Sequence, residues 1–303
     1  MSKLLRNYFL KNDLPVIAAP LFIISNPKLV IEQNNSGIIG SFPALNARSS
    51  TQLDKWIYEI KKSTNNKSLF AVNKIVHPSN KRLSHDLNVI VKHEVPIVIT
   101  SLGVNPYIIN AIHRYNGIVL HDVTNNKHAK KAISSGADGL IAVCEGSGGH
   151  SGSQSPFSLI PEIREWYDGL LGLSGSIYNG RSIASAIKLG ADFAYIGTPF
   201  IATKEGNASN KYKKMIIDST SEDIINTNVF TGINGNYLKP SIENEGINLN
   251  EIEKGNVNFL SDQNSSKPWK NIWSAGTGIS QIKEIMTTSS LVQNIKNEYK
   301  IHK

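Results

Sequence analysis

Short apolar runs recur at close intervals along the first two thirds of the chain. Each run holds four to six residues with almost no alternation between apolar and polar positions. Strands show this pattern when a parallel sheet buries both of their faces. We therefore predict eight strands, at residues 15–19, 37–42, 69–73, 96–100, 117–120, 139–143, 170–174 and 193–197.

Helical patterns fill the gaps between the apolar runs. Between the third and fourth runs, apolar residues at positions 83, 87, 90 and 91 have the spacing of one helix face. Between the fifth and sixth runs, a second helical pattern ends at Gly136, because glycine commonly stops a helix. The segment 132–138 also resembles the segment 186–192, two strand–helix units later. Eight strands that alternate with helices predict an α/β fold, a (β/α)8 TIM barrel over residues 1–203, rather than a doubly wound sheet.

The alternation stops after the eighth run. Residues 204–273 are rich in Asn, Ser, Gly and Lys, with one helix-like pattern at 212–218. Tyr237, Trp269 and Trp273 provide apolar area that a disordered linker would leave unburied. We therefore predict an inserted lid or substrate region that covers the barrel mouth.

The last segment, residues 274–303, returns to an amphipathic pattern. Ile279, Ile282, Ile285 and Met286 fall on one face of a possible helix. We predict that this segment packs back on the barrel as its closing helix.

Composition and charge narrow the class of protein. The chain has 303 residues, 40% of them hydrophobic, and a net charge of +8, but its lysines are scattered rather than gathered into a nucleic-acid-binding run. Cys144 is the single cysteine, which excludes an intramolecular disulfide and fits a reducing compartment. No segment has the apolar length of a membrane span or a signal peptide. We expect a cytoplasmic protein without nucleic-acid or membrane partners; its oligomeric state is left open, with a homodimer as one option.

One stretch after the sixth apolar run combines a histidine with glycines. Residues 144–152 read CEGSGGHSG and place His150 among four glycines. In a (β/α)8 barrel, catalysis takes place at the carboxyl ends of the strands. Glycines let a flat ligand approach the backbone, and an imidazole can transfer protons near neutral pH. The strand pattern therefore favours an active site at His150 over the alternative, a flexible loop with a solvated histidine.

Glycines and hydroxyl residues also follow the seventh and eighth runs. Gly175 and Ser176 come after the seventh run, and Gly197 and Thr198 end the eighth. Barrels of this type commonly bind phosphate after these two strands. Backbone N–H groups, hydroxyls and a helix start predict a phosphate monoester site that needs no Walker motif.

The remaining strand ends carry small residues and neutral hydrogen-bonding groups, which suit a flat heterocycle better than a metal ion. His121, Asp122 and His150 are three candidate metal ligands. Neighbouring residues of a strand point to opposite faces, however. We therefore expect no metal site, and we expect His121 and Asp122 to be structural or supporting residues.

In their order and spacing, these motifs resemble the nitronate monooxygenase family, formerly called 2-nitropropane dioxygenases, whose members are FMN-binding (β/α)8 barrels. The resemblance spans nearly the whole chain. The stretches that carry it are 19–22, 37–46, 72–73, 121–124, 148–152, 180–181, 190–192, 196–198 and 273–278.

The resemblance implies FMN as the cofactor, lying across the barrel mouth. Its phosphate is expected after the seventh and eighth strands, and the segment 275–278 is expected to close over it. His150 matches the family's active-site histidine and is the expected catalytic residue. The implied cofactor-binding residues are Ala18, Ala19, Pro20, Asn73, Gly148, Gly149, Gly175, Ser176, Gly197, Thr198, Ala275, Gly276 and Thr277.

The implied function is FMN-dependent oxidation of an alkyl nitronate by O2, without NAD(P)H, to an oxo compound and a nitrogen oxide. Propionate 3-nitronate is the expected toxic substrate, so the partners are a small anionic substrate and O2, and the role is detoxification. His150 is expected either to pair as imidazolium with the nitronate oxygens or, as a neutral base, to remove the α-proton of a nitroalkane. Two alternatives stay open: a flavoenzyme similar to the FMN-dependent, NAD(P)H-using enoyl-acyl-carrier-protein reductases, and a flavin-binding module without turnover.

Two positions depart from the family pattern. Many members carry Glu-Ala-Gly-Gly-His, whereas here Gly146 and Ser147 separate Glu145 from the glycine pair. A position that is often Gly-Gly reads Gly175-Ser176. We expect both departures to leave FMN binding intact and to bear on substrate preference.

Overall fold

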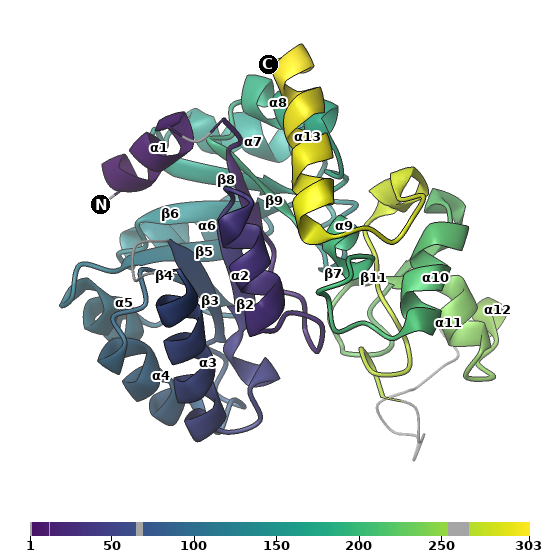
Figure 1. Ribbon diagram of the computed structural model, residues 1–303, viewed down its shortest axis with the longest axis horizontal. Helices are drawn as coiled ribbons and strands as arrows, with labels where there is room; N and C mark the ends of the chain where they lie inside the picture. Colours follow the sequence, from purple (N-terminus) through teal and green to yellow (C-terminus); the bar gives the residue numbers. More distant parts are fainter. Residues whose placement is uncertain (1, 12, 65–68, 254–266) are drawn as a thin grey trace.

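The computed structural model describes residues 2–11, 13–64, 69–253 and 267–303 (Figure 1). Eight parallel strands form one sheet in the order β1-β9-β8-β6-β5-β4-β3-β2. Between β1 and β2 the Ala18 N–H donates to Ile39 O at 2.8 Å, which brings the two edges of the sheet together into a barrel. The strands are β1 (Val16–Ala18), β2 (Gly40–Pro43), β3 (Phe70–Ile75), β4 (Ile97–Ser101), β5 (Ile118–Val123), β6 (Gly139–Val143), β8 (Leu170–Ser174) and β9 (Phe193–Ile196). The predicted (β/α)8 barrel is thereby confirmed.

Helices follow the strands and cover the outside of the barrel (Figure 1). Most of them begin at an Asn or Ser whose side chain accepts a hydrogen bond from the first turn, as Asn125 does before α6. Gly136, with φ of +99°, follows the end of that helix, as predicted. The first seven barrel helices are α2 (Pro27–Asn35), α3 (Ser50–Ser63), α4 (Leu83–Lys92), α5 (Pro106–His113), α6 (Asn126–Ser134), α7 (Pro156–Arg164) and α8 (Gly180–Leu189).

The eighth barrel helix comes from the end of the chain. Helix α13 (Thr288–His302) packs against both α8 and α2 (Figure 1). The helix predicted over 279–286 is wrong in position, because that stretch holds only a short 3-10 turn, η3 (Thr277–Gln281). Its apolar face is used differently: Ile279 is buried against residues of the insertion, and the helix proper begins after its N-cap, Thr287.

The amino end of the barrel is covered by α1 (Ser2–Lys11), a helix that the strand pattern did not predict. Leu5 and Phe9 are buried with the barrel interior, and the ring of Phe9 stacks on Phe193 at 5.3 Å between centroids. This end is therefore filled with apolar side chains.

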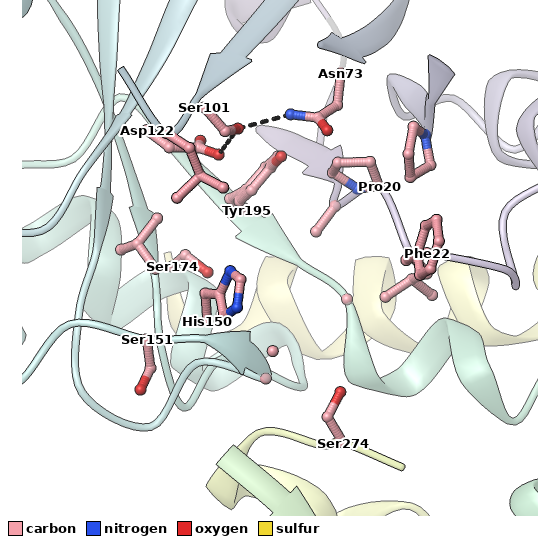
Figure 2. Close-up of a pocket in the computed structure, with 18 of the residues that line it drawn as sticks. Pro20, Phe22, Asn73, Ser101, Asp122, His150, Ser151, Ser174, Tyr195 and Ser274 are labelled. Atoms are coloured by element: carbon pink, nitrogen blue, oxygen red, sulfur yellow. Dashed lines mark hydrogen bonds between the residues drawn. The ribbon is translucent and has the colours of Figure 1, made fainter. Parts of the chain in front are cut away.

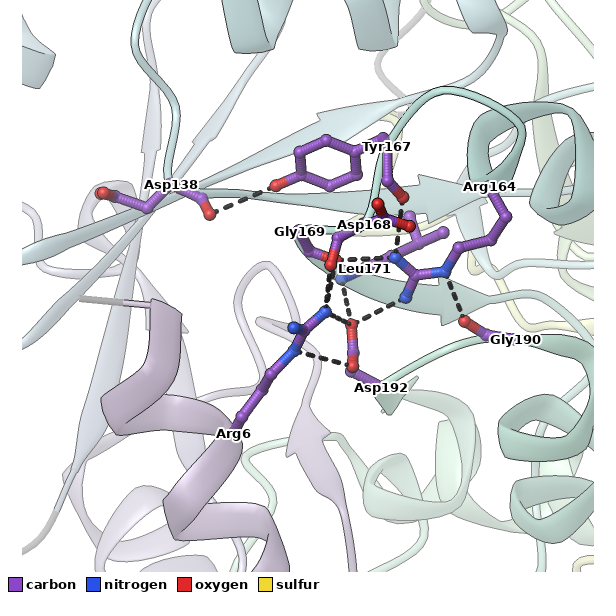
Figure 3. Close-up of polar contacts among 9 residues, drawn as sticks. All are labelled: Arg6, Asp138, Arg164, Tyr167, Asp168, Gly169, Leu171, Gly190 and Asp192. Atoms are coloured by element: carbon purple, nitrogen blue, oxygen red, sulfur yellow. Dashed lines mark hydrogen bonds and ion pairs between the residues drawn. The ribbon is translucent and has the colours of Figure 1, made fainter.

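The repeated Gly-Ala-Asp segments link neighbouring strands. Asp138 accepts a hydrogen bond from the Val119 N–H, and Asp192 accepts one from the Leu171 N–H, each at 2.8 Å. Asp192 also pairs with two arginines, Arg6 from α1 and Arg164 from α7 (Figure 3). The repeat is thus explained by strand-to-strand bonds at the amino end of the barrel.

The described part of the insertion forms a small unit with its own sheet. Strands β10 (Ile224–Thr227) and β11 (Gly235–Leu238) pair antiparallel, and β11 also pairs with β7 (Gly149–His150), which lies in the loop after β6. Residues 254–266 of the predicted 204–273 lid lie outside the described residues. The other short elements are η1 (Ala44–Asn46), α9 (Thr198–Ile201), α10 (Asn210–Asp218), η2 (Ser221–Asp223), α11 (Lys239–Glu243) and α12 (Leu249–Glu253). None of the described helices has the length and apolar character needed to cross a membrane.

Candidate active site

A cavity of about 760 Å³ lies at the carboxyl ends of the strands, between the barrel loops and the insertion. Much of its wall is apolar, and Pro20 and Phe22 follow β1 into it (Figure 2). Trp269, Ile233 and Tyr212 close the side formed by the insertion. Its size and apolar lining fit an aromatic ligand together with a small substrate.

A smaller lobe adjoins this cavity at the ends of β8 and β9. It is lined by backbone and hydroxyl groups, among them Ser174, Ser176 and Thr198, and its described lining contains no Lys, Arg or His. The cavity and the lobe share Gly148, Ser174, Tyr195, Gly197 and Thr198. Neutral donors gathered at strand ends suit a phosphate group, so the donor set fits the phosphate of FMN.

Three loops pack so closely around the lobe that glycine is required. A Cβ on Gly148 would lie 2.9 Å from the Gly276 nitrogen, and Gly175 has φ of +132°. The Thr198 hydroxyl accepts a hydrogen bond from the Gly276 N–H at 2.9 Å. These glycines therefore allow loop-to-loop contact, a role beyond the ligand approach that the sequence suggested.

Most of the expected cofactor-binding residues surround this joined space. The larger cavity is lined by Ala19, Pro20, Asn73, Gly148, Gly149, Gly197, Thr198 and Ala275, and the lobe adds Gly175, Ser176 and Gly276. Ala18 and Thr277 line neither part. Ala18 is buried between the sheet and the helices, and the Thr277 hydroxyl instead bonds the Ser176 hydroxyl at 2.8 Å.

His150 is held where the barrel meets the insertion. The backbone of His150 in β7 pairs with that of Gly235 in β11. The imidazole Nε2 lies 3.0 Å from the Thr231 hydroxyl oxygen. The indole of Trp269 packs edge-on against the imidazole at 5.3 Å. Burial lowers the pKa of His150, so the ring is neutral at pH 7 and suited to accept a proton.

A chain of polar side chains forms the floor of the cavity. Asn73 donates to the Ser101 hydroxyl at 2.7 Å, and Ser101 donates to Asp122 at 2.5 Å (Figure 2). Burial raises the pKa of Asp122 to about 7, and the hydrogen bond from Ser101 lowers it only in part. Tyr195 lies beside this chain, and burial raises its pKa well above 10.

Asp122 and His121 occupy opposite faces of β5, as expected. Asp122 shares the face of Leu120, inside the barrel, whereas His121 shares the face of Val119, under the outer helices. Burial, reinforced by nearby His128, lowers the pKa of His121 to about 4. Over residues 2–11, 13–64, 69–253 and 267–303, no group of three His, Cys, Asp or Glu side chains is arranged to hold a metal.

Sequence reasoning missed Tyr195, Thr231 and Trp269 as lining or supporting residues. Tyr195 could have been found, because it alternates with Phe193 on the inward face of the last strand. Thr231 has no such signal, since its contact with His150 depends on how the insertion folds.

A (β/α)8 barrel whose strand ends hold an apolar cavity, a phosphate-suited lobe and a half-buried histidine has the layout of a barrel enzyme with room for a phosphorylated ligand. A family described as nitronate monooxygenase matches residues 46–298, and the chain belongs to this family. At the level of the family, it is a flavin-dependent oxidoreductase.

Individual relatives are distant. A probable nitronate monooxygenase of Staphylococcus aureus (strain JH9) is 26% identical, over 77% of this chain and 79% of that protein. The (3aS,4S,5R,7aS)-5-hydroxy-7a-methyl-1-oxo-octahydro-1H-indene-4-carboxyl-CoA dehydrogenase of Rhodococcus jostii (strain RHA1) is also 26% identical, over 66% of this chain but only 55% of that protein. A nitroalkane oxidase structure from Streptomyces ansochromogenes has a TM-score of 0.80 at 22% identity, covering 95% of this chain and 96% of its own, which shows the shared fold.

Proposed function

We propose that this protein uses FMN to oxidise alkyl nitronates with O2, giving an oxo compound and a nitrogen oxide without NAD(P)H. Propionate 3-nitronate is the proposed substrate, and removal of this toxic anion in the cytoplasm is the proposed role. Family membership and the likeness to a nitroalkane oxidase fold support the reaction class. The chain has a single cysteine, Cys144, which fits a reducing compartment.

The residues around the cavity would hold FMN in two parts. Gly175, Ser176, Gly197 and Thr198 would bind the phosphate through backbone N–H and hydroxyl groups. Ala19, Pro20, Asn73, Gly148 and Gly149, with Ala275 and Gly276 at the closing loop, would surround the ring. When bound, the flavin supplies electron transfer between the nitronate and O2.

The proposal rests chiefly on His150, because it is a half-buried, neutral imidazole on the wall of this cavity. Of the two expected roles, the lowered pKa supports the neutral base over the imidazolium. As a base, His150 would remove the α-proton of a nitroalkane and so form the nitronate in place. Trp269 and the apolar wall would exclude water while the proton moves.

The first test is oxygen uptake by the FMN-loaded protein on addition of propionate 3-nitronate with no nicotinamide present. We expect rapid uptake. His150→Asn should lower turnover of neutral nitroalkanes by roughly 100-fold, because the base is lost, and lower turnover of preformed nitronates much less. Equal, negligible losses on both substrates would remove His150 from the mechanism. Absence of uptake with flavin bound would remove the monooxygenase proposal itself.

A second candidate is an NAD(P)H-dependent flavin reductase acting on an enoyl thioester. The match to a dehydrogenase of a carboxyl-CoA compound favours it. NAD(P)H consumption that depends on an enoyl thioester distinguishes this reaction from nitronate oxidation.

A further inference from the structure

One arm of the cavity is cationic, whereas the rest of its wall is largely apolar. The arm runs from the ends of β4 and β5 toward the first turns of α6, where Thr124, His128 and Lys131 line it. Among the described lining residues, Lys131 is the single Lys or Arg, and it is exposed at the rim. Asp122, the single acidic residue of that described lining, stands on the floor and is largely protonated below pH 7.

Neither Lys131 nor His128 has an ion-pair partner within the described chain. The ion pairs found among the described residues include neither Lys131 nor His128. Residues 128 and 131 are three apart on one helix, so their side chains lie on the same face. A pair of donors without an ion-pair partner at a cavity rim indicates an anionic ligand.

The hydrogen bonds of Asn125 determine which nitrogen of His128 is free to donate. Asn125 caps α6 by accepting the His128 N–H at Oδ1, 2.8 Å away, so the amide orientation is fixed. Its Nδ2 then faces His128 Nδ1 at 3.2 Å and can only donate to it. In the neutral ring the proton is therefore on Nε2, which makes no hydrogen bond to the rest of the described chain and is available to a ligand.

The arm is also separate from the lobe that suits the cofactor phosphate. The lobe lies at the ends of β8 and β9, and the arm at the ends of β4 and β5. In the strand order, β6 stands between β8 and β5, and the loop after β6 carries His150. The cationic arm and the phosphate lobe therefore lie on opposite sides of β6, the strand whose loop carries His150.

We propose that Lys131 and His128 form a subsite that binds the anionic end of the substrate, a carboxylate or a phosphate, while the reacting carbon lies near His150. The proposal rests on the proposed function in placing the reacting end at His150. A free acid such as propionate 3-nitronate would bring a carboxylate, and an acyl-CoA would bring phosphates. Both would be bound through the Lys131 ammonium and the His128 Nε2–H.

Two nitronates of the same chain length test the subsite. Propionate 3-nitronate carries a carboxylate where propyl-1-nitronate carries a methyl group. Lys131→Met keeps the apolar stem and should lower kcat/KM for propionate 3-nitronate about tenfold, mainly through KM, because one charge-assisted hydrogen bond is lost. Propyl-1-nitronate should change less than twofold. Equal losses on both substrates would overturn the proposal.

Lys130→Met is the matched control. It removes the same charge from the same helix, but Lys130 packs over the Trp166 ring at 5.7 Å and does not line the cavity. Long-range electrostatics would affect both variants alike. The subsite requires that Lys130→Met leave the ratio of the two kcat/KM values unchanged and that His128→Gln shift it in the same direction as Lys131→Met.

Calorimetric titration of the FMN-loaded protein tests anion binding at the subsite independently of nitronate oxidation. The probes are 3-nitropropionate, 1-nitropropane and coenzyme A, none of which needs to turn over. Weaker binding of 3-nitropropionate to Lys131→Met, with 1-nitropropane unchanged, supports a carboxylate subsite even if no oxygen is consumed. Weaker binding of coenzyme A alone assigns the subsite to phosphate. Affinities that do not depend on Lys131 for either anion would overturn the proposal.

Discussion

At the scale of single residues, the most consequential contact is the one between His150 and Thr231. The Thr231 hydroxyl donates to the Ile233 carbonyl at 3.2 Å and accepts from the Ile233 N–H at 3.4 Å, and its oxygen lies 3.0 Å from His150 Nε2. Because the hydroxyl proton is used on the carbonyl, we expect the remaining lone pair to accept from His150 Nε2–H, so that neutral His150 presents Nδ1 as the base. In this arrangement Thr231 is a positioning residue that sets the tautomer.

Thr231→Val should therefore weaken proton abstraction without emptying the site. We expect nitroalkane turnover to fall about tenfold and nitronate turnover to change little, because the base loses its fixed tautomer and orientation. Thr231→Ser should restore the wild-type rate. Nitrogen-15 NMR of the His150 ring gives an independent measurement: wild type should show protonated Nε2, and an unchanged tautomer in the Val variant would contradict this role.

At the scale of secondary-structure elements, Asp192 joins three of them at the amino end of the barrel. Its carboxylate accepts from the Leu171 N–H of β8, from Arg6 of α1 and from Arg164 of α7 (Figure 3). The Asp192 side chain is 20% exposed, so solvent weakens these bonds only in part. The contact fixes the helix that covers the barrel bottom.

Asp192→Ala should lower the free energy of unfolding by roughly 2 kcal/mol, because two arginines and one backbone N–H lose their acceptor. Thermal unfolding would show this as a drop in Tm of several degrees. Asp13→Ala is the control, since Asp13 pairs with Lys296 and Lys300 at the surface and should leave Tm unchanged. Matching Tm values for the two variants would refute the role given to Asp192.

The sequence predicted elements wherever a local pattern decides the structure. Each apolar run forms a strand because its residues are buried on both faces. The two aspartates of the partial repeat, Asp138 and Asp192, occupy equivalent positions, since each accepts a hydrogen bond from a backbone N–H of the neighbouring strand. The sequence did not predict elements that depend on pairing with a strand far away in the chain. Strand β7 has only two residues and exists because β11, more than 80 positions away, pairs with it. Ile279 and Ile282 pack on the insertion while Ile285 stays exposed, so this stretch had no need to be helical.

At the scale of the whole molecule, the cavity could be predicted only in part. Glycine and hydroxyl residues at strand ends indicate a ligand because barrels use that edge, and three residues selected in this way, Gly175, Ser176 and Thr198, line the lobe. Their role in cofactor binding stays a prediction. The chain from Asn73 through Ser101 to Asp122 depends on the register of three strands. Such registers are set by the closed barrel rather than by any local segment.

The closed barrel also makes global stability depend on the pH through two neighbouring residues of β5. Asp122 has a pKa of about 7 when folded, above its ordinary 3.8, so its contribution to stability is lost as the pH rises from about 4 to 7. His121 has a pKa of about 4 when folded, below its ordinary 6.5, so its contribution is lost as the pH falls through that same range. The two slopes oppose each other, and the wild-type stability should be nearly flat between pH 4 and 6.5.

In Asp122→Asn, the pH dependence of the free energy of unfolding that His121 causes should become measurable. The amide cannot ionise, so the variant should gain roughly 2 to 4 kcal/mol over wild type at pH 8 and little or nothing at pH 4. Its free energy of unfolding should rise with pH between 4 and 6.5, where the wild type is flat. Urea unfolding at pH 4, 5, 6 and 8 measures both curves. A constant difference between them at every pH would mean that Asp122 does not titrate in this window, and that the cavity floor carries a fixed charge at neutral pH.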